Sequence, residues 1–111
     1  MNVYDTANRL ADEIRNSSEV LEYKKIREEL DKNLEVKEKI AEFEKVRYDA
    51  QLEALKGEEQ DKEKIDKAQK IYLELIQNEL AKKYFDAELK FNVLLTDVNR
   101  IIASSVQDIL V

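Results

Sequence analysis

Apolar residues recur with helical spacing along most of the chain, and the clearest run begins at Leu80. It continues in steps of four and three residues, which is the heptad spacing of helices that pack along a seam. The stripe consists of Leu80, Tyr84, Ala87, Phe91, Leu94, Val98, Ile101 and Ser105. Beside it lie Leu95, Ile102, Val106 and Ile109. These flanking residues make the apolar face about twice as wide as a two-stranded seam requires, which favours two or more neighbouring helices.

The stretch 79–110 contains neither proline nor glycine, and its pattern predicts one helix. At 1.5 Å per residue, that helix would be on the order of 48 Å long. The helices expected over 4–31 are much shorter. Within one chain, the wide apolar face of the C-terminal helix therefore cannot be fully covered. We therefore expect a second copy of the chain to cover it. The candidate self-association residues are Tyr84, Phe91, Leu94, Leu95, Val98, Ile101, Ile102, Val106 and Ile109.

The rest of the chain is also predicted to be helical. Short helices are expected over about 4–31, with Asp5 as the first cap and a break at the sequence NSSE (16–19), where Ser17 or Ser18 can cap a second helix. A long helix is expected over 34–56, with Asn33 as its cap, followed by a polar loop at 57–61 and helices over 62–110, with Asp61 as a candidate cap. Gly57 suits the left-handed residue that ends a helix. Asn78 offers a break, so continuity between 62–78 and 79–110 stays open.

Composition strengthens this reading of an all-α fold in a single helical domain, residues 1–111. Glycine occurs once and proline never, and tight turns depend on both. No apolar run approaches the ~20 residues that span a bilayer. The opening residues lack the basic and apolar regions of a signal peptide, so we expect a cytoplasmic protein without membrane contact.

The types of residue present limit the chemistry. The chain has no cysteine and no histidine, which excludes disulfides, thiolate nucleophiles, Cys-ligated metals and Ser–His–Asp triads. One glycine cannot build a phosphate-binding glycine loop. The balance of 19 Lys and Arg against 25 Asp and Glu gives a net charge of −6, which disfavours direct nucleic-acid binding. We assign no catalytic, cofactor-binding or metal-binding residue and predict that the protein is not an enzyme.

Two kinds of polar residue remain open to interpretation. Acidic clusters such as Asp61, Glu63 and Asp66 are typical of a solvated helix face, although carboxylates also bind metals. Arg47 interrupts the apolar stripe of the helix expected over 34–56. It either pairs with a carboxylate such as Glu88 in a neighbouring helix or extends along the edge of the core.

Three segments carry a family resemblance: NVYDTANRLADEIRNSSEVLEYKKIREEL (2–30), IAEFEKVRYDAQLEALKG (40–57) and AELKFNVLLTDVNRIIASSVQDIL (87–110). Together they resemble the YlbF/YmcA-like family of bacterial helical proteins, and the opening is most similar to its YheA-type branch. The resemblance implies an elongated helical bundle with a long antiparallel hairpin, and dimers or larger assemblies. It also implies a regulatory role, because the better-known relatives regulate competence, sporulation and biofilm formation. Those relatives act with a partner that modulates an RNA-degrading endonuclease. Some relatives hold an iron–sulfur cluster through cysteines, which this chain lacks.

The sequence therefore predicts a non-enzymatic, self-associating protein that regulates or scaffolds a protein partner and needs no cofactor. Two alternatives remain open at this point. One is a carboxylate-based metal-binding protein. The other is a subunit of an RNA-processing complex with direct RNA contact.

Overall fold

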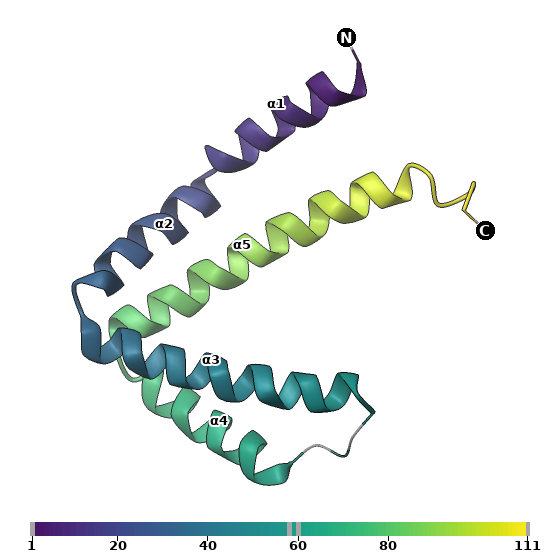
Figure 1. Ribbon diagram of the computed structural model, residues 1–111. Coiled ribbons are helices and arrows are strands. Elements are labelled where there is room, and N and C mark those ends of the chain that lie inside the picture. Colours follow the sequence, from purple (N-terminus) through teal and green to yellow (C-terminus); the bar gives the residue numbers. More distant parts are fainter. Residues whose placement is uncertain (1, 58, 60, 111) are drawn as a thin grey trace. The chain divides into compact units, whose positions relative to one another are not determined.

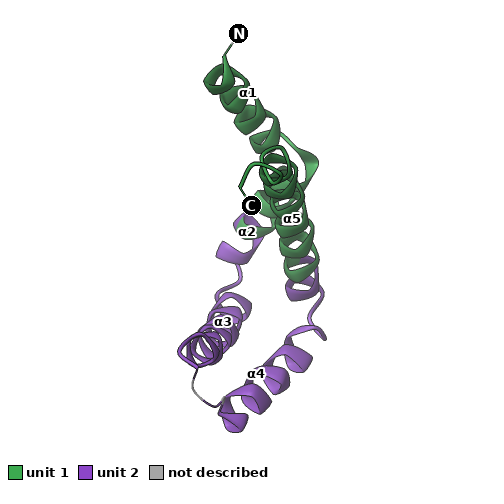
Figure 2. Ribbon diagram, turned by 90° about the vertical axis from the view of Figure 1, so that its right-hand side faces the viewer, with its two compact units in different colours: residues 1–27, 84–111 green, residues 28–83 purple. Residues whose placement is uncertain are grey.

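The computed structural model describes every residue except 1, 58, 60 and 111 (Figure 1). Its helices are α1 (Val3–Arg15), α2 (Ser18–Asp31), α3 (Leu34–Leu55), α4 (Lys62–Leu75) and α5 (Glu79–Ser104). No strand occurs among the described residues, and the predicted all-α class is confirmed. The chain divides into two compact units, shown in Figure 2: unit 1 comprises residues 1–27 and 84–111, and unit 2 comprises residues 28–83.

Polar side chains cap the helices where the chain changes direction. Asn33 Oδ1 accepts a hydrogen bond from the Val36 N–H, and Asp61 Oδ1 accepts one from the Glu63 N–H, as predicted. The cap expected at Asp5 was wrong: Asn2 Oδ1 accepts the Asp5 N–H at 2.9 Å. α1 therefore begins earlier, and Asp5 lies in its first turn, where an acidic side chain suits the positive end of the helix dipole.

Unit 2 contains the predicted antiparallel hairpin, made by α3 and α4 (Figure 1). Gly57 ends α3 in the left-handed conformation, with φ of 73°, as its position predicts. The buried side chains of this unit are Leu30, Val36, Ile40, Phe43, Ile71, Leu75 and Ala81. Lys39 Nζ lies 2.6 Å from Glu74 Oε2, and Lys64 pairs with Glu53, so ion pairs join α3 to α4 at two points.

α4 and α5 are separate helices. α4 ends at Leu75, and Asn78 Oδ1 accepts a hydrogen bond from the Ala81 N–H at 3.0 Å, which caps α5. The break falls at the residue that the sequence offered for it, because asparagine satisfies the unpaired N–H groups of a first turn.

Unit 1 contains α1, the first part of α2 and most of α5. The prediction of one helix to Leu110 was wrong, because α5 ends at Ser104 and is about 39 Å long. The Ser105 hydroxyl donates to the Ile102 carbonyl at 2.7 Å, and the next backbone N–H groups bond three residues back. Serine competes in this way with the helical pattern, and the chain tightens into turns.

Candidate self-association surface

Exposure rises along the predicted stripe from the buried residues Tyr84 and Ala87 to the end of α5. Tyr84 is only 3% exposed, and Phe91, Leu94, Leu95 and Val98 are partly buried. The remaining candidates are exposed: Ile101 (71%), Ile102, Val106 and Ile109. Val106 and Ile109 no longer continue the helical stripe, because they lie in the turns after Ser104. The apolar surface left open by the chain therefore lies towards the C-terminal half of α5.

The buried end of the stripe is occupied by the chain's own aromatic residues. The Tyr23 ring stacks on Phe91 with centroids 5.2 Å apart, and it lies 5.7 Å from the Tyr84 ring. The Tyr84 hydroxyl donates to Glu88 Oε2 at 3.1 Å and lies 3.4 Å from the Tyr23 hydroxyl. These contacts join α2 to α5 inside unit 1, so Tyr84 packs within the chain rather than facing outward.

α1 lies beside the exposed end of the stripe, and its apolar residues range from exposed Val3 to half-buried Leu10 and Ile14. No residue of α1 is buried, although Val3, Ala7, Leu10 and Ile14 follow one another at helical spacing. Val3 is 80% exposed. Together with Ile102 of α5, residues Asn2, Val3, Thr6, Ala7 and Leu10 line an open cavity of about 490 Å³. We use the name terminal apolar face for Val3, Leu10 and Ile102, which line this cavity, together with Ile101, the exposed neighbour of Ile102 in α5.

Sequence reasoning missed Val3 and Tyr4 as candidates, although both are highly exposed apolar residues. The available signal was local. Val3 lies one helical turn before Ala7 and extends the stripe that the sequence places at Ala7, Leu10 and Ile14. Recognising Asn2 as the cap would have included Val3 in the helix.

A second open surface in unit 1 lies where α2 begins beside α5. Leu89, Val93 and Leu94 form its apolar part, and Leu89 and Val93 are exposed. Its rim is mostly acidic. The Ser18 hydroxyl donates to Glu19 Oε1 at 2.6 Å and, with a backbone N–H and nearby Lys90, lowers the pKa of the Glu19 carboxyl below its usual range. The Glu19 carboxyl at this rim is therefore negatively charged at neutral pH.

A comparison with known proteins decides the family. The family model described as "Control of competence regulator ComK, YlbF/YmcA" matches residues 3–107. The chain belongs to the YlbF/YmcA family. The match covers nearly the whole chain, so the resemblance seen in the sequence is confirmed.

Relatives within the YlbF/YmcA family align along most of their length. The UPF0342 protein of Caldicellulosiruptor bescii is 30% identical over 106 residues, covering 96% of this chain and 89% of that protein. A UPF0342 protein of Listeria monocytogenes is 32% identical over 109 residues, covering 98% and 93% respectively. The solved structure titled "Protein of Unknown Function (DUF964) from Bacillus stearothermophilus" matches with a TM-score of 0.84 at 18% identity, covering 96% of this chain and 93% of that one. That likeness supports the fold, and none of these descriptions names a reaction.

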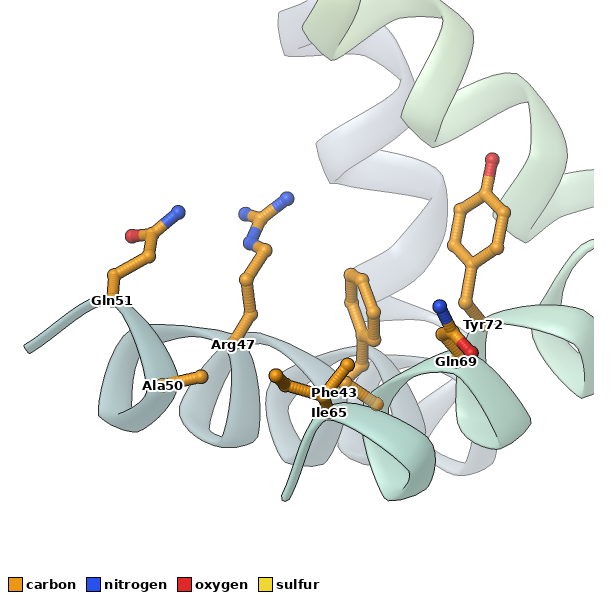
Figure 3. Close-up of a pocket in the computed structure, with 8 residues that line it drawn as sticks. Phe43, Arg47, Ala50, Gln51, Ile65, Gln69 and Tyr72 are labelled. Atoms are coloured by element: carbon orange, nitrogen blue, oxygen red, sulfur yellow. The ribbon is translucent and has the colours of Figure 1, made fainter. Parts of the chain in front are cut away.

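Unit 2 has an open pocket on its hairpin, shown in Figure 3. Its volume is about 300 Å³, and we call it the hairpin pocket. The lining residues are Phe43, Arg47, Ala50 and Gln51 of α3 and Ile65, Ala68, Gln69 and Tyr72 of α4. The Arg47 guanidinium lies 5.2 Å from the centre of the Phe43 ring. Arg47 thus extends along an aromatic residue at the edge of the core, and its pairing with Glu88 stays a prediction.

The acidic residues do not gather into a metal-binding geometry in the part of the chain that the structure describes. No group of three Asp or Glu side chains there lies close enough together to hold a metal ion. Over the same residues, no helix combines the length and the apolar character needed to cross a membrane.

Proposed function

We propose that this YlbF/YmcA-family member is a non-enzymatic, self-associating protein of the bacterial cytoplasm. It acts as a regulatory or scaffolding factor through protein–protein contacts. The observation that carries the proposal is the terminal apolar face, where α1 has no buried residue and Ile101 is 71% exposed.

An isolated helix of about 12–15 residues is marginal in water, so packing of its apolar face normally stabilises it. α1 has 13 residues and gains no buried side chain within the chain. A second copy that covers Val3 and Leu10 of α1 supplies that packing. Contiguous exposed apolar surface is also a common mark of a protein interaction site.

A second copy suits this surface because the terminal apolar face can be covered by the same apolar face of another chain. A two-fold contact pairs the same patch on both chains, and an apolar face meets an apolar face without burying charge. In such a pair, α1 and the C-terminal half of α5 from each copy form a four-helix layer. That arrangement provides the additional neighbours that the wide stripe on α5 predicts.

The regulatory part of the proposal rests on the family. The description of the family model names the control of a competence regulator. A protein with such a role acts on other proteins. The absence of histidine and cysteine from the sequence removes the commonest general base and the thiol nucleophile, in keeping with a binding function.

Sedimentation equilibrium from nanomolar to tens of micromolar protein tests self-association. We expect the native chain to be a dimer or larger at the upper end. Ile101→Asp should raise the dissociation constant by roughly 30-fold or more, the size of a hot-spot loss of about 2 kcal/mol. Asn99→Asp places the same charge at a nearby exposed position outside the stripe and should change the constant little.

Two results would overturn the proposal. The first is a native chain that stays monomeric at tens of micromolar. The second is an Ile101→Asp variant that associates as tightly as the Asn99→Asp control. The far-ultraviolet circular dichroism of both variants checks that each chain keeps its helices. Because Ile101 is exposed, its replacement removes little packing within the chain itself.

A further inference from the structure

The hairpin pocket of unit 2 combines an apolar floor with polar side chains at its rim, contributed by both α3 and α4. Phe43, Ile65 and Tyr72 are the large apolar and aromatic side chains among its lining residues. Figure 3 shows Arg47 and Gln51 extending to the same side of the hairpin, above Ala50 and Ile65. Of the side chains that line it, Arg47 is the charged one. The pocket therefore suits an aliphatic side chain that is accompanied by a carboxylate.

The rim also indicates what backbone such an occupant has. The Gln51 and Gln69 side chains each carry an amide, which both donates and accepts hydrogen bonds. Inside a helix, the backbone groups are already paired with one another. A non-helical segment has backbone N–H and C=O groups that still need partners. Such a segment can therefore form hydrogen bonds to the Gln51 and Gln69 amides, whereas the paired backbone groups of a helix cannot.

The chain itself contains a segment with this chemistry. Residues 105–109 form turns after α5, and Ile109 and Leu110 are 74% and 77% exposed. Asp108 places a carboxylate directly before them. The segment thus presents exposed aliphatic side chains and a negative charge on a non-helical backbone, which the end of α5 at Ser104 sets apart from the terminal apolar face.

We propose that the hairpin pocket of one copy receives residues Asp108–Leu110 of a second copy. Ile109 lies on the apolar floor formed by Phe43 and Ile65, and the Asp108 carboxylate pairs with the Arg47 guanidinium. This inference rests on the proposed self-association, because it requires a second copy. It adds a contact for unit 2 that is separate from the terminal apolar face of unit 1.

The geometry of Arg47 favours such a pair. Its guanidinium lies over the Phe43 ring, which restricts the side chain before any ligand arrives and so reduces the entropy lost on binding. A guanidinium carries five N–H donors in a planar fork that matches a carboxylate. It can therefore keep its contacts within the chain and still receive Asp108.

Site-specific disulfide formation tests the inference, because the native chain has no cysteine to interfere. One preparation carries Ala50→Cys on the pocket floor, and a second, with a different affinity tag, carries Ile109→Cys. Mixing them under mild oxidation should give a disulfide between the two tagged chains. In the matched control, Tyr48→Cys replaces Ala50→Cys. Tyr48 is an exposed residue of α3 that does not line the pocket.

Charge reversal makes the test specific. Arg47→Glu in the Ala50→Cys chain should lower the yield of the mixed disulfide roughly tenfold, because two carboxylates then face each other. Asp108→Lys in the Ile109→Cys chain should restore most of that yield when the two reversed chains are combined. A structural effect of Arg47→Glu alone would not be repaired by a change on the other chain.

The outcomes separate this inference from the proposed function. A mixed disulfide that needs Ala50→Cys and follows the charge pattern supports the docked segment. Equal yields with Ala50→Cys and Tyr48→Cys, or a yield insensitive to Arg47→Glu, overturn it. If sedimentation shows the same mixture to be dimeric without a mixed disulfide, only this inference fails. If the mixture is monomeric, the inference and the proposed self-association fail together.

Discussion

The two units of this chain use similar amphipathic helices in different ways. In unit 2, α3 and α4 face each other as a hairpin and bury Ile40, Phe43 and Leu75. In unit 1, α1 has an apolar stripe with the same helical spacing but buries none of its residues. Periodicity therefore tells where a helix forms, but it does not tell whether the chain itself supplies the covering surface. In unit 1 we propose that a second copy does so.

The largest effect should come from opening the core of unit 2. Leu75 is 2% exposed, so Leu75→Ala should lower the free energy of unfolding by about 2–5 kcal/mol through lost contacts and a cavity. Urea denaturation followed by circular dichroism measures the change. Leu73→Ala, on the same helix but 60% exposed, should stay within about 0.5 kcal/mol of the native chain. Equal losses for both variants would show that the hairpin core is misplaced.

An intermediate effect is expected inside unit 1, where α2 meets α5. Tyr84→Phe removes the hydroxyl that donates to Glu88 and approaches the Tyr23 hydroxyl. Because Tyr84 is buried, the loss should destabilise the chain by about 0.5–1.5 kcal/mol, the net value of one hydrogen bond. Thermal unfolding compares it with Tyr48→Phe at an exposed position. A Tyr84→Phe variant as stable as that control would argue against a structural role for the tyrosine pair.

The smallest effect is the pH dependence of the ion pair between α3 and α4. The hydrogen bond from Lys39 holds the pKa of the Glu74 carboxyl below its usual range. Since the folded pKa is the lower one, this contribution to stability is present above the unfolded pKa of about 4.3 and is lost as the pH falls through the folded pKa.

Replacing Glu74 isolates that contribution. The stability advantage of the native chain over Glu74→Gln should shrink between neutral pH and acid conditions, as measured by urea denaturation in matched buffers. Glu38→Gln, at an exposed position of α3, controls for removing one negative charge from the chain. If the difference in unfolding free energy between the native chain and Glu74→Gln stays constant with pH, Lys39 and Glu74 do not interact in solution.

Much of the fold could be predicted from the sequence because local chemistry determines it. Asn33, Gly57, Asp61 and Asn78 all mark helix ends where the structure has them, since capping and the left-handed conformation depend on the residue itself. The end of α5 was missed because the apolar spacing continues to Ile109, while the Ser105 hydroxyl bonds to the backbone in a way that periodicity does not reveal.

The candidate surface was predictable only in part. Spacing alone groups Tyr84 with Ile101, yet the first is buried and the second exposed. The difference arises from Tyr23, which meets Tyr84 from a helix distant in sequence. The hairpin pocket was not predicted at all, because it forms only where α3 and α4 come together in space. Arg47 was recognised as an interruption of a stripe, but its neighbours on α4 could not be named.

Hydrogen exchange at two protein concentrations tests the central claim most directly. If a second copy covers the terminal apolar face, the backbone amides of α1 should exchange slowly when the chain is associated. They should exchange quickly after dilution below the dissociation constant, because a bare helix of this length opens readily. The buried part of the α3–α4 hairpin should keep the greater part of its protection. Equal protection of α1 at both concentrations, with sedimentation confirming the change in association, would contradict the account.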